Sequence, residues 1–433
     1  MSRPSTPRRA LAALAALGAF TGVASCGSAG TEGAPPTILT FWGWAPGYQE
    51  ATTQFNTTHP RVRVEFRRIT PGSQGGYAAI QSAVKGGTAP CLIQMGYESL
   101  PSFVAEGALQ PIGQSVINER VQYSEPAWQQ TSVAGEVYGF PVDLGPMALY
   151  YRRDVYARYG LKPQATWQDF AADAARLRQA APERHLTLFT PDDPWWFAAL
   201  TAQANGSWFD VKGRTWRVNT TDPNSSKVTA YWQALLDKGL VKTEKAYSDG
   251  LFTGLQNGTI AAVPAPAWFS GLLAQKAAGA AGQWAVAPMP RWNAGDASAG
   301  FDGGSATALV KGCSAAGAAL EFADWLGSDR KSLEILVDKA GIYPAAIAAD
   351  SLPALNRPDP YFGNQVIFDV FRNAARNGTN WTWGPVMTET SAVLSSELTK
   401  AVAERTPLRT ALQTARDRTV EAMRGKGIDT AAD

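Results

Sequence analysis

Aromatic and carboxyl side chains stand at the ends of several predicted strands. Trp44 closes the run TILTFWGW, Glu98 follows the apolar run CLIQMG, and Asp143 lies between two β-like runs. An indole offers a flat surface for stacking, while a carboxylate accepts hydrogen bonds in fixed directions. Such groups suit a ligand with apolar faces and hydroxyl-bearing edges. Two carboxylates on either side of one bond would instead suit general acid and base catalysis.

The elements that place these groups alternate between strand and helix. Residues 38–44, 61–69 and 91–96 are typical of strands, because their apolar residues run continuously or alternate with charged ones. Residues 48–55 and 77–85 carry apolar side chains at helical spacing. The order β-α-β-α-β predicts a parallel sheet with right-handed crossovers, and ligands bind such sheets at the carboxyl ends of the strands.

The ends of these three strands therefore predict one shared site. Trp44 lies at the end of the first strand, Gln74 in the loop after the second, and Tyr97 and Glu98 just past the third. Trp42 shares the face of Trp44 in a regular strand, where it is either a deeper wall of the site or part of the core.

A different pattern begins in the segment EVYGFPVDLGPMALYYRRDVYARYG. Val137–Phe140 and Met147–Arg152 are typical of two short strands, and they are joined by the proline- and glycine-bracketed run PVDLGP. This pattern favours a pair of strands that cross between two lobes.

Capping residues mark the ends of the helices that follow. Thr166 is the expected N-cap of the helix in TWQDFAADAARLRQA. In the last helix, Thr406 is the expected N-cap, Pro407 the first helical residue and Gly425 the residue past the end.

The first 25 residues are typical of a secretory signal peptide, with arginines followed by a short apolar run and small residues. The ending VASC resembles a bacterial lipobox, so cleavage is expected to leave Cys26 as a diacylated first residue. The Arg8–Arg9 pair leaves export by the Sec or the Tat route open. Residues 26–36 have the composition of a flexible tether.

Composition excludes several classes of function. The net charge is +2 with both signs mixed along the chain, which argues against a nucleic-acid partner. The two histidines and three cysteines show no metal-ligand spacing, so no metal and no cofactor is expected. After the leader, no stretch is apolar enough for a membrane helix, and the chain is long enough for two lobes.

The chain resembles the family 1 extracellular solute-binding proteins, which are the maltose-binding-protein-like receptors of carbohydrate ABC importers. The segments that carry this resemblance are VASC, LTFWGW, GGTAPCLIQMGYESLPSFVAEGALQPI, YGFPVDLGPMALYYRRDVYARYGL, PQATWQDFAADAARL, QWAVAPMP and GFDGGSATALVKG. One departure is Cys91, where such proteins often carry Asp after G-T-A-P. The resemblance implies a two-lobed α/β periplasmic-binding-protein fold of type II, with three crossings between the lobes.

The resemblance also implies the extent of the lobes. The N-terminal lobe is expected to comprise residues 37–142 and 288–342, and the C-terminal lobe residues 143–287 and 343–433. The crossings then fall near residues 142–144, 287–289 and 342–344. The implied protein is a monomer on the outer face of the bacterial cytoplasmic membrane, lipid-anchored through Cys26. It binds a mono- or oligosaccharide in the cleft and delivers it to ABC permease subunits, without catalysis.

The expected ligand contacts combine strand-end residues with tryptophans and polar groups of the crossings. They are Trp44, Gln74, Tyr97, Glu98, Asp143, Trp195, Trp196, Trp268, Asp302, Gly303, Gly304, Tyr343 and Trp383. Trp195 and Trp196 are consecutive, so only one of them can face the cleft from a helix. The glycines after Asp302 permit close backbone approach to a hydroxyl. Three other tryptophans are assigned to the core, namely Trp167, Trp232 and Trp325.

The alternative is a lipid-anchored glycoside hydrolase, in which Glu98 and Asp143 would be the carboxylate pair. No G-x-S-x-G elbow or phosphate-binding loop is present in the sequence. Release of monosaccharide from a disaccharide would distinguish the hydrolase from the binding protein.

Two cysteines remain beyond the leader, Cys91 and Cys313. The family topology returns the strand that ends near Cys313 to the lobe that contains Cys91, and export makes oxidation possible. A disulfide is therefore expected, and two separate buried thiols are the alternative.

Overall fold

One long strand, β6 (Gly139–Arg152), is shared by two groups of strands. The computed structural model describes residues 35–113, 116–293, 295–296, 299–379 and 381–431. Residues 36–433 form one compact unit, which contains both groups of strands. The predicted signal peptide, Cys26 and most of the tether lie outside the described residues.

The predicted β-α-β-α-β order is confirmed. The elements are β1 (Thr37–Gly43), α1 (Tyr48–Thr58), β2 (Val62–Arg68), α2 (Gly76–Lys85) and β3 (Leu92–Gly96). Strand β1 pairs in parallel with both β2 and β3, so the carboxyl ends of all three strands meet at one edge. The apolar face of α1 is buried as its spacing predicts.

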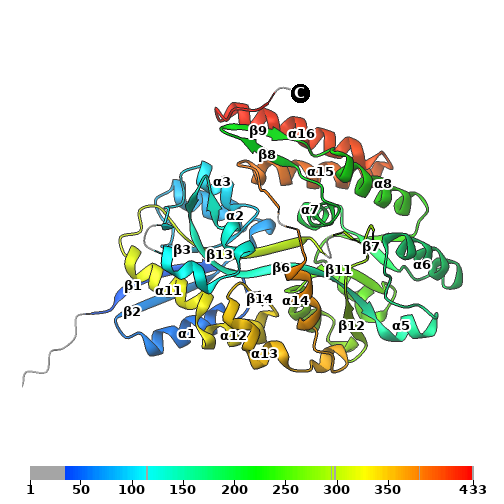
Figure 1. Cartoon of the computed structure of the whole chain (residues 1–433), viewed down its shortest axis with the longest axis horizontal. Coiled ribbons are helices and arrows are strands. Elements are labelled where there is room, and N and C mark those ends of the chain that lie inside the picture. Colours follow the sequence, from blue (N-terminus) through cyan, green and yellow to red (C-terminus); the bar gives the residue numbers. More distant parts are fainter. Residues whose placement is uncertain (1–34, 114–115, 294, 297–298, 380, 432–433) are drawn as a thin grey trace, which may run out of the picture. The chain divides into compact units, whose positions relative to one another are not determined.

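Strand β6 connects the two groups of strands because its two halves have different partners. Its first half pairs with β13 (Phe301–Leu309) and β14 (Tyr343–Pro344), and its second half pairs with β11 (Ala262–Pro266) and β12 (Trp284–Ala287). The strand order is β11-β6-β13-β3-β1-β2 (Figure 1).

The prediction of two short strands in this segment was wrong, because β6 is continuous. Proline fixes φ near the extended region and removes only one donor, so it interrupts hydrogen bonding without ending the strand. Pro141 and Pro146 both lie where the pairing of β6 with β13 is irregular, since the register shifts between Phe301 and Gly304 and between Ser305 and Ala306.

The remaining elements lie outside this main sheet. The helices are α3 (Leu100–Ala105), α4 (Glu125–Gln130), α5 (Arg153–Arg158), α6 (Trp167–Ala180), α7 (Pro194–Gln203), α8 (Pro223–Asp237), α9 (Asp249–Asn257), α10 (Phe269–Lys276), α11 (Ala316–Ser328), α12 (Arg330–Ala340), α13 (Pro353–Asn356), α14 (Phe368–Arg376), α15 (Met387–Glu404) and α16 (Leu408–Gly425). The short strands are β4 (Ser132–Val133), β5 (Glu136–Val137), β7 (Thr187–Phe189), β8 (Phe209–Lys212), β9 (Thr215–Val218) and β10 (Val241–Thr243). Single 3₁₀ turns are η1 (Gly72–Gln74), η3 (Ile117–Gln122), η4 (Ala278–Ala280), η5 (Ile347–Ser351) and η6 (Pro360–Phe362).

The helix ends follow the predicted caps in one case and not in the other. Thr166 caps α6 by accepting a hydrogen bond from the backbone N–H of Asp169. Thr406 is not the N-cap of α16, because its N–H bonds to the carbonyl of Ala401 and so closes the preceding helix. Pro407 therefore stands at the N-cap position, and Gly425 is the last helical residue.

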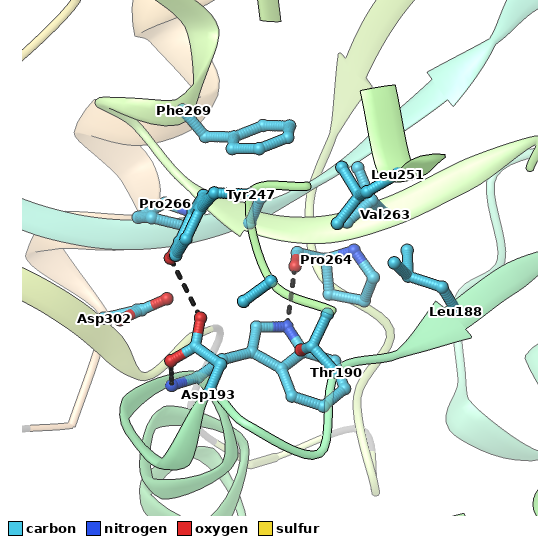
Figure 2. Close-up of a pocket in the computed structure, with 13 residues that line it drawn as sticks. Leu188, Thr190, Asp193, Tyr247, Leu251, Val263, Pro264, Pro266, Phe269 and Asp302 are labelled. Carbon is cyan, nitrogen blue, oxygen red and sulfur yellow. Dashed lines mark hydrogen bonds between the residues drawn. The ribbon is translucent and has the colours of Figure 1, made fainter. Parts of the chain in front are cut away.

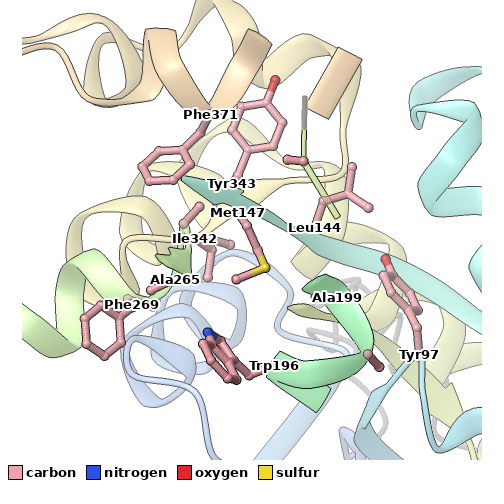
Figure 3. Close-up of a cluster of buried hydrophobic side chains, with 14 of the residues drawn as sticks. Tyr97, Leu144, Met147, Trp196, Ala199, Ala265, Phe269, Ile342, Tyr343 and Phe371 are labelled. Carbon is pink, nitrogen blue, oxygen red and sulfur yellow. The ribbon is translucent and has the colours of Figure 1, made fainter. Parts of the chain in front are cut away.

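The core extends on both sides of β6 (Figure 3). Figure 3 shows Leu144 and Met147 of β6 among aromatic side chains of other elements, which are Tyr97, Trp196, Phe269, Tyr343 and Phe371. Trp167 and Trp232 are fully buried, as expected. Trp325 is partly exposed and packs edge-on against Phe55, with ring centroids 5.3 Å apart.

A disulfide joins Cys91, immediately before β3, to Cys313, four residues after β13. It therefore links two segments that are 222 residues apart in sequence but belong to neighbouring strands. Among the described residues, no helix is long and apolar enough to span a membrane.

Candidate functional site

Four carboxyl groups are buried at the end of β3, within the first half of β6 and at the starts of α7 and β13. The exposed fractions of Glu98, Asp143, Asp193 and Asp302 are 7, 5, 7 and 3%. Among the described residues, one cationic side chain is comparably buried, that of Arg152. The Arg152 guanidinium bonds to Asp154, to Gln283 and to two helix carbonyls, so it serves other partners. The buried part of the site is therefore acidic.

Glu98 is held at the end of β3 by a tyrosine. The hydroxyl of Tyr77, on α2, donates to Oε1 of Glu98 at 2.5 Å, and burial raises the pKa of the Glu98 carboxyl. The Tyr77 ring meets the indole of Trp44 edge-on, with centroids 5.9 Å apart. Gly96 leaves room for the carboxyl group, since a Cβ there would lie 2.2 Å from its oxygen. The first and third strand ends thus meet, as predicted.

Asp143 belongs to a hydrogen-bond network that fixes the turn after β1. Its Oδ1 accepts from Ser305 Oγ at 2.6 Å, and Ser305 Oγ accepts from Nε2 of Gln94 at 3.3 Å. The Oε1 of Gln94 in turn accepts from the backbone N–H of Trp44 at 2.9 Å. Burial raises the pKa of Asp143 to about 7. The backbone carbonyl of Asp143 accepts from the Tyr97 hydroxyl at 2.9 Å.

Asp193 caps α7, and its carboxyl group also faces the side chain of Tyr247 (Figure 2). Its Oδ1 accepts from the backbone N–H of Trp196 at 3.2 Å, and its Oδ2 accepts from the Tyr247 hydroxyl at 2.9 Å. Tyr247 has a φ of 57°, in the left-handed region that bulky residues rarely adopt. Both side chains line a cavity of about 30 Å³.

Asp302 lines the same cavity from the start of β13. Its backbone carbonyl accepts from Nε1 of Trp268 at 3.0 Å. Gly303 and Gly304 follow with φ of 75° and 92°, and a Cβ on Gly304 would lie 2.7 Å from the ring of Tyr97. These glycines therefore let β13 bend next to the site.

The carboxyl groups also share one electrostatic environment. The pKa of Asp302 is raised well above its ordinary value, first by burial and then by the charges of Asp193 and Glu98. Burial also raises the pKa of Asp193, although its hydrogen bonds oppose this. In the part of the chain that the structure describes, no group of three or more His, Cys, Asp or Glu residues could hold a metal ion.

A chain of indoles lies beside α7. Trp195 meets Trp383 edge-on at a centroid distance of 5.8 Å, Trp383 lies 5.7 Å from Trp381, and Trp381 lies 5.3 Å from Trp208. Trp195 is partly exposed, whereas Trp196 is buried and donates its Nε1 hydrogen to the carbonyl of Pro264 at 2.9 Å. The two consecutive indoles thus face different surroundings, as a helix requires.

Among the described residues, two predicted contacts make no hydrogen bond to the buried carboxyl groups. Gln74 is exposed at the end of η1. Tyr343 is buried beside Leu144 in β14, and its hydroxyl donates to Asp350 at 3.4 Å. Trp42 is partly buried, packs against the hydrophobic core and carries the guanidinium of Arg67 over its ring, 4.7 Å from the centroid, so it lies at the edge of the core.

Three residues of the site were not predicted from the sequence, namely Tyr77, Asp193 and Tyr247. Asp193 had a readable signal, because Asp before Pro194 at the first position of a helix is a capping pattern. Tyr247 had none, since no sequence pattern announces an aromatic residue at positive φ.

Segments assigned to different lobes are in contact near the site. The backbone N–H of Thr388 donates to Ser102 Oγ at 3.4 Å, and Nε2 of Gln130 donates to the carbonyl of Trp381 at 3.0 Å. Lys426 forms an ion pair with Glu106 at 3.7 Å. These contacts therefore join segments that the expected boundaries place in different lobes.

Comparison with known proteins assigns the chain to a family. The profile of the family described as bacterial extracellular solute-binding protein matches residues 43–331. Among curated proteins, the lactose-binding protein of Rhizobium radiobacter is 23% identical over 359 residues, which cover 77% of this chain and 81% of the relative.

Two solved structures resemble the chain over nearly its whole length. The ABC-transporter-associated binding protein of B. animalis subsp. lactis in complex with β-1,6-galactobiose is 25% identical with a TM-score of 0.83. The galacto-N-biose-/lacto-N-biose I-binding protein of Bifidobacterium longum in complex with lacto-N-biose is 25% identical with a TM-score of 0.84. Each match covers 92% of this chain and 100% of the other.

These matches establish the two-lobed periplasmic-binding-protein fold that the resemblance implied. The family match spans more than half of the sequence and includes Trp44, Glu98, Asp193 and Asp302. The chain therefore belongs to the bacterial extracellular solute-binding protein family.

Proposed function

We propose that this chain is the substrate-binding lipoprotein of a carbohydrate ABC importer and takes up a di- or oligosaccharide between its two lobes. The observation that carries this proposal is the buried acidic group of Glu98, Asp193 and Asp302, which come from three different elements. Carboxylates accept hydrogen bonds from sugar hydroxyls, and the neighbouring Trp268 and Tyr247 rings offer surfaces for the faces of a sugar.

The charge of the site narrows the class of ligand. An anionic ligand would bring more negative charge against buried carboxyl groups whose pKa values are already raised, while the buried guanidinium of Arg152 is engaged elsewhere. Sugar phosphates and uronic acids are therefore disfavoured. Neutral sugars and sugars with positive charge remain.

The relatives suggest which neutral sugars to test first. Lactose, β-1,6-galactobiose and lacto-N-biose all carry a β-linked galactose, and these are the ligands named for the curated relative and the two structures. We expect a β-galactosyl disaccharide to bind. Isothermal titration with these three sugars, with maltose and glycerol 3-phosphate as controls, tests this. Binding of maltose alone would reject the β-galactosyl preference, and binding of glycerol 3-phosphate would reject the charge argument.

Delivery to the permease follows from closure of the lobes. The proposed lobes are residues 37–142 with 288–342 and residues 143–287 with 343–433. A ligand that contacts both lobes favours the closed state through its higher affinity for that state. Small-angle scattering should give a smaller radius of gyration with bound sugar, and identical profiles at saturation would reject hinge closure.

The hydrolase alternative has less support. Asp143 already accepts a hydrogen bond from Ser305 in the network that positions Trp44, and the matched relatives are binding proteins. We propose that the bound sugar is released unchanged. Incubation of the purified protein with lactose should leave no free galactose, and release that is lost in Glu98→Gln would restore the hydrolase.

A further inference from the structure

Asp302 has a buried carboxyl group with no hydrogen-bond donor among the described residues. Its side chain is only 3% exposed, and it lines the cavity between α7 and the loop that carries Tyr247. Figure 2 shows its carboxyl group directed toward Tyr247 and Asp193. Trp268, the nearby donor, bonds to the backbone carbonyl of Asp302 and not to the carboxyl group. A buried carboxyl without a donor is costly, so this group points to a missing partner.

The neighbouring groups cannot supply that partner. Asp193 is itself a carboxyl group, and it already receives the Tyr247 hydroxyl and the N–H of Trp196. The other lining residues are mostly apolar, such as Phe269 and Leu251. The cavity of about 30 Å³ has room for one group the size of a water molecule or an ammonium.

The surroundings of Asp302 also disfavour its ionised form. Burial raises its pKa well above the ordinary value and the charges of Asp193 and Glu98 raise it further, so a carboxylate at this position needs a positive charge beside it. Within the described residues, Arg152 is the one buried cation, and its guanidinium is bound to Asp154 and to helix carbonyls. No metal-binding group of three side chains is found there either. A neutral hydroxyl would supply a hydrogen bond but would not favour ionisation of these carboxyl groups, whereas a cation would.

We propose that the saccharide carries a protonated amino group, which enters the cavity and bonds to the Asp302 carboxylate. The proposal rests on the proposed sugar-binding function and specifies its ligand as an amino sugar. An ammonium donates hydrogen bonds and neutralises charge at once, and the Tyr247 and Trp196 rings of the cavity favour a cation further.

Matched sugars that differ in one substituent test the proposal. The first set is lactose, lactosamine with a free amine, and N-acetyllactosamine, and the second is galactose, galactosamine and N-acetylgalactosamine. Titration calorimetry near pH 7 keeps the amines largely protonated, while a lower pH would favour the uncharged form of Asp302. We expect the amine member of at least one set to bind about tenfold more tightly than its hydroxyl and acetamido partners, because a charge-assisted bond exceeds a neutral one.

The Asp302→Asn variant tests the assigned residue. It should reduce the preference for the amine to about threefold or less while neutral sugars still bind, because an amide keeps the shape without the charge. Asp324→Asn is the matched control, since Asp324 is a partly buried carboxylate that bonds to Tyr123. It should keep the full preference. Thermal unfolding of both variants verifies that they are folded.

The outcomes separate this proposal from the function on which it rests. Equal or weaker binding of the amines, with clear binding of lactose or galactose, would overturn the amino-sugar proposal and leave sugar binding intact. An amine preference that persists in Asp302→Asn would overturn the role of Asp302. No binding of any sugar would overturn both.

Discussion

The hydroxyl of Tyr247 donates to Oδ2 of Asp193 at 2.9 Å, although the Tyr247 backbone lies at a φ of 57°. A non-glycine residue in this region is strained by about 1 kcal/mol or more. The strain is borne at a position whose ring also faces Trp268, at a centroid distance of 6.1 Å. The strained backbone of Tyr247 thus holds its hydroxyl against Asp193, and both side chains line the cavity.

Tyr247→Phe should weaken sugar binding and leave the fold intact. The change removes one hydrogen bond and leaves Asp193 with backbone donors alone, so affinity for lactose should fall by about 1 kcal/mol, or roughly fivefold. Titration calorimetry measures the affinity. Tyr231→Phe is the matched control, because the Tyr231 hydroxyl bonds to the carbonyl of Trp167 at 2.7 Å. It should lower the melting temperature but not the affinity, and equal losses of affinity would contradict a local role for Tyr247.

Trp44→Ala should weaken lactose binding by roughly 1–3 kcal/mol, as truncation of a buried aromatic contact does. The indole is partly buried and packs on Tyr77, which holds Glu98, so its loss also loosens that carboxyl group. Calorimetry and thermal unfolding should be measured together. Normal binding with early melting would mean that Trp44 belongs to the core.

Trp325→Ala should lower stability without changing lactose affinity, so it serves as the reference for the Trp44→Ala experiment. Trp325 packs on Phe55 and Phe322 at the edge of the core. Truncation of a fully buried tryptophan costs about 3–5 kcal/mol of stability. Trp325 is partly exposed, so we expect its loss to lie at the lower end of this range. Sugar affinity should be unchanged.

The alternation of strands and helices at the start of the fold could be predicted because it depends on local patterns. The alternation of Val62 and Val64 with arginines predicted β2, and the apolar run at Leu92 predicted β3. The unbroken strand β6 could not be predicted, because prolines at 141 and 146 resemble loop signals when their pairing partners are unknown. Pairing with β13 and β11 comes from distant parts of the sequence.

The site was only partly predictable for the same reason. Trp44, Glu98 and Asp302 were identified because strand ends and glycines mark them locally. Asp193 and Tyr247 join them through long-range folding, since the carboxyl and the hydroxyl are 54 residues apart in sequence. Burial of several carboxyl groups together is a property of the folded chain, and no local pattern announces it.

Cys26→Ala should release the protein from the membrane fraction and leave lactose affinity unchanged. The expected tether of residues 26–36 separates the lipid from the folded unit, which begins at Pro36. Fractionation with detection of the protein in membrane and soluble fractions measures release. Full retention of the variant in the membrane fraction would contradict the lipobox prediction.

The buried carboxyl groups predict a pH dependence of stability. The pKa of Asp143 is about 7 in the folded state, above the ordinary value of 3.8, so between these values the folded protein holds a proton that the unfolded chain has lost. The free energy of unfolding should therefore fall as pH rises from about 4 to about 7 and stay level above that range. The raised pKa values of Glu98 and Asp302 act in the same direction.

His185 acts in the opposite direction, because burial lowers its pKa to about 4 from 6.5. Its contribution to stability is lost as pH falls through this window. Comparison of the ligand-free protein with Asp143→Asn isolates the carboxyl group, since the amide cannot ionise. Melting temperatures at several pH values should fall less steeply with rising pH in the variant, and parallel curves would contradict a protonated Asp143.

The disulfide between Cys91 and Cys313 should make a large contribution to stability without affecting the hinge. Its cysteines are 222 residues apart, so the chain-entropy relation gives about 5 kcal/mol. Both cysteines flank neighbouring strands, β3 and β13, within the proposed N-terminal lobe. Lactose affinity should therefore change little in the Cys91→Ala/Cys313→Ala double variant, while its melting temperature falls.

The oxidised mature protein should be two hydrogens lighter than the reduced protein and should yield no free thiol after denaturation. Two titratable thiols would show that the bond does not form, and the cysteines would then contribute to packing alone.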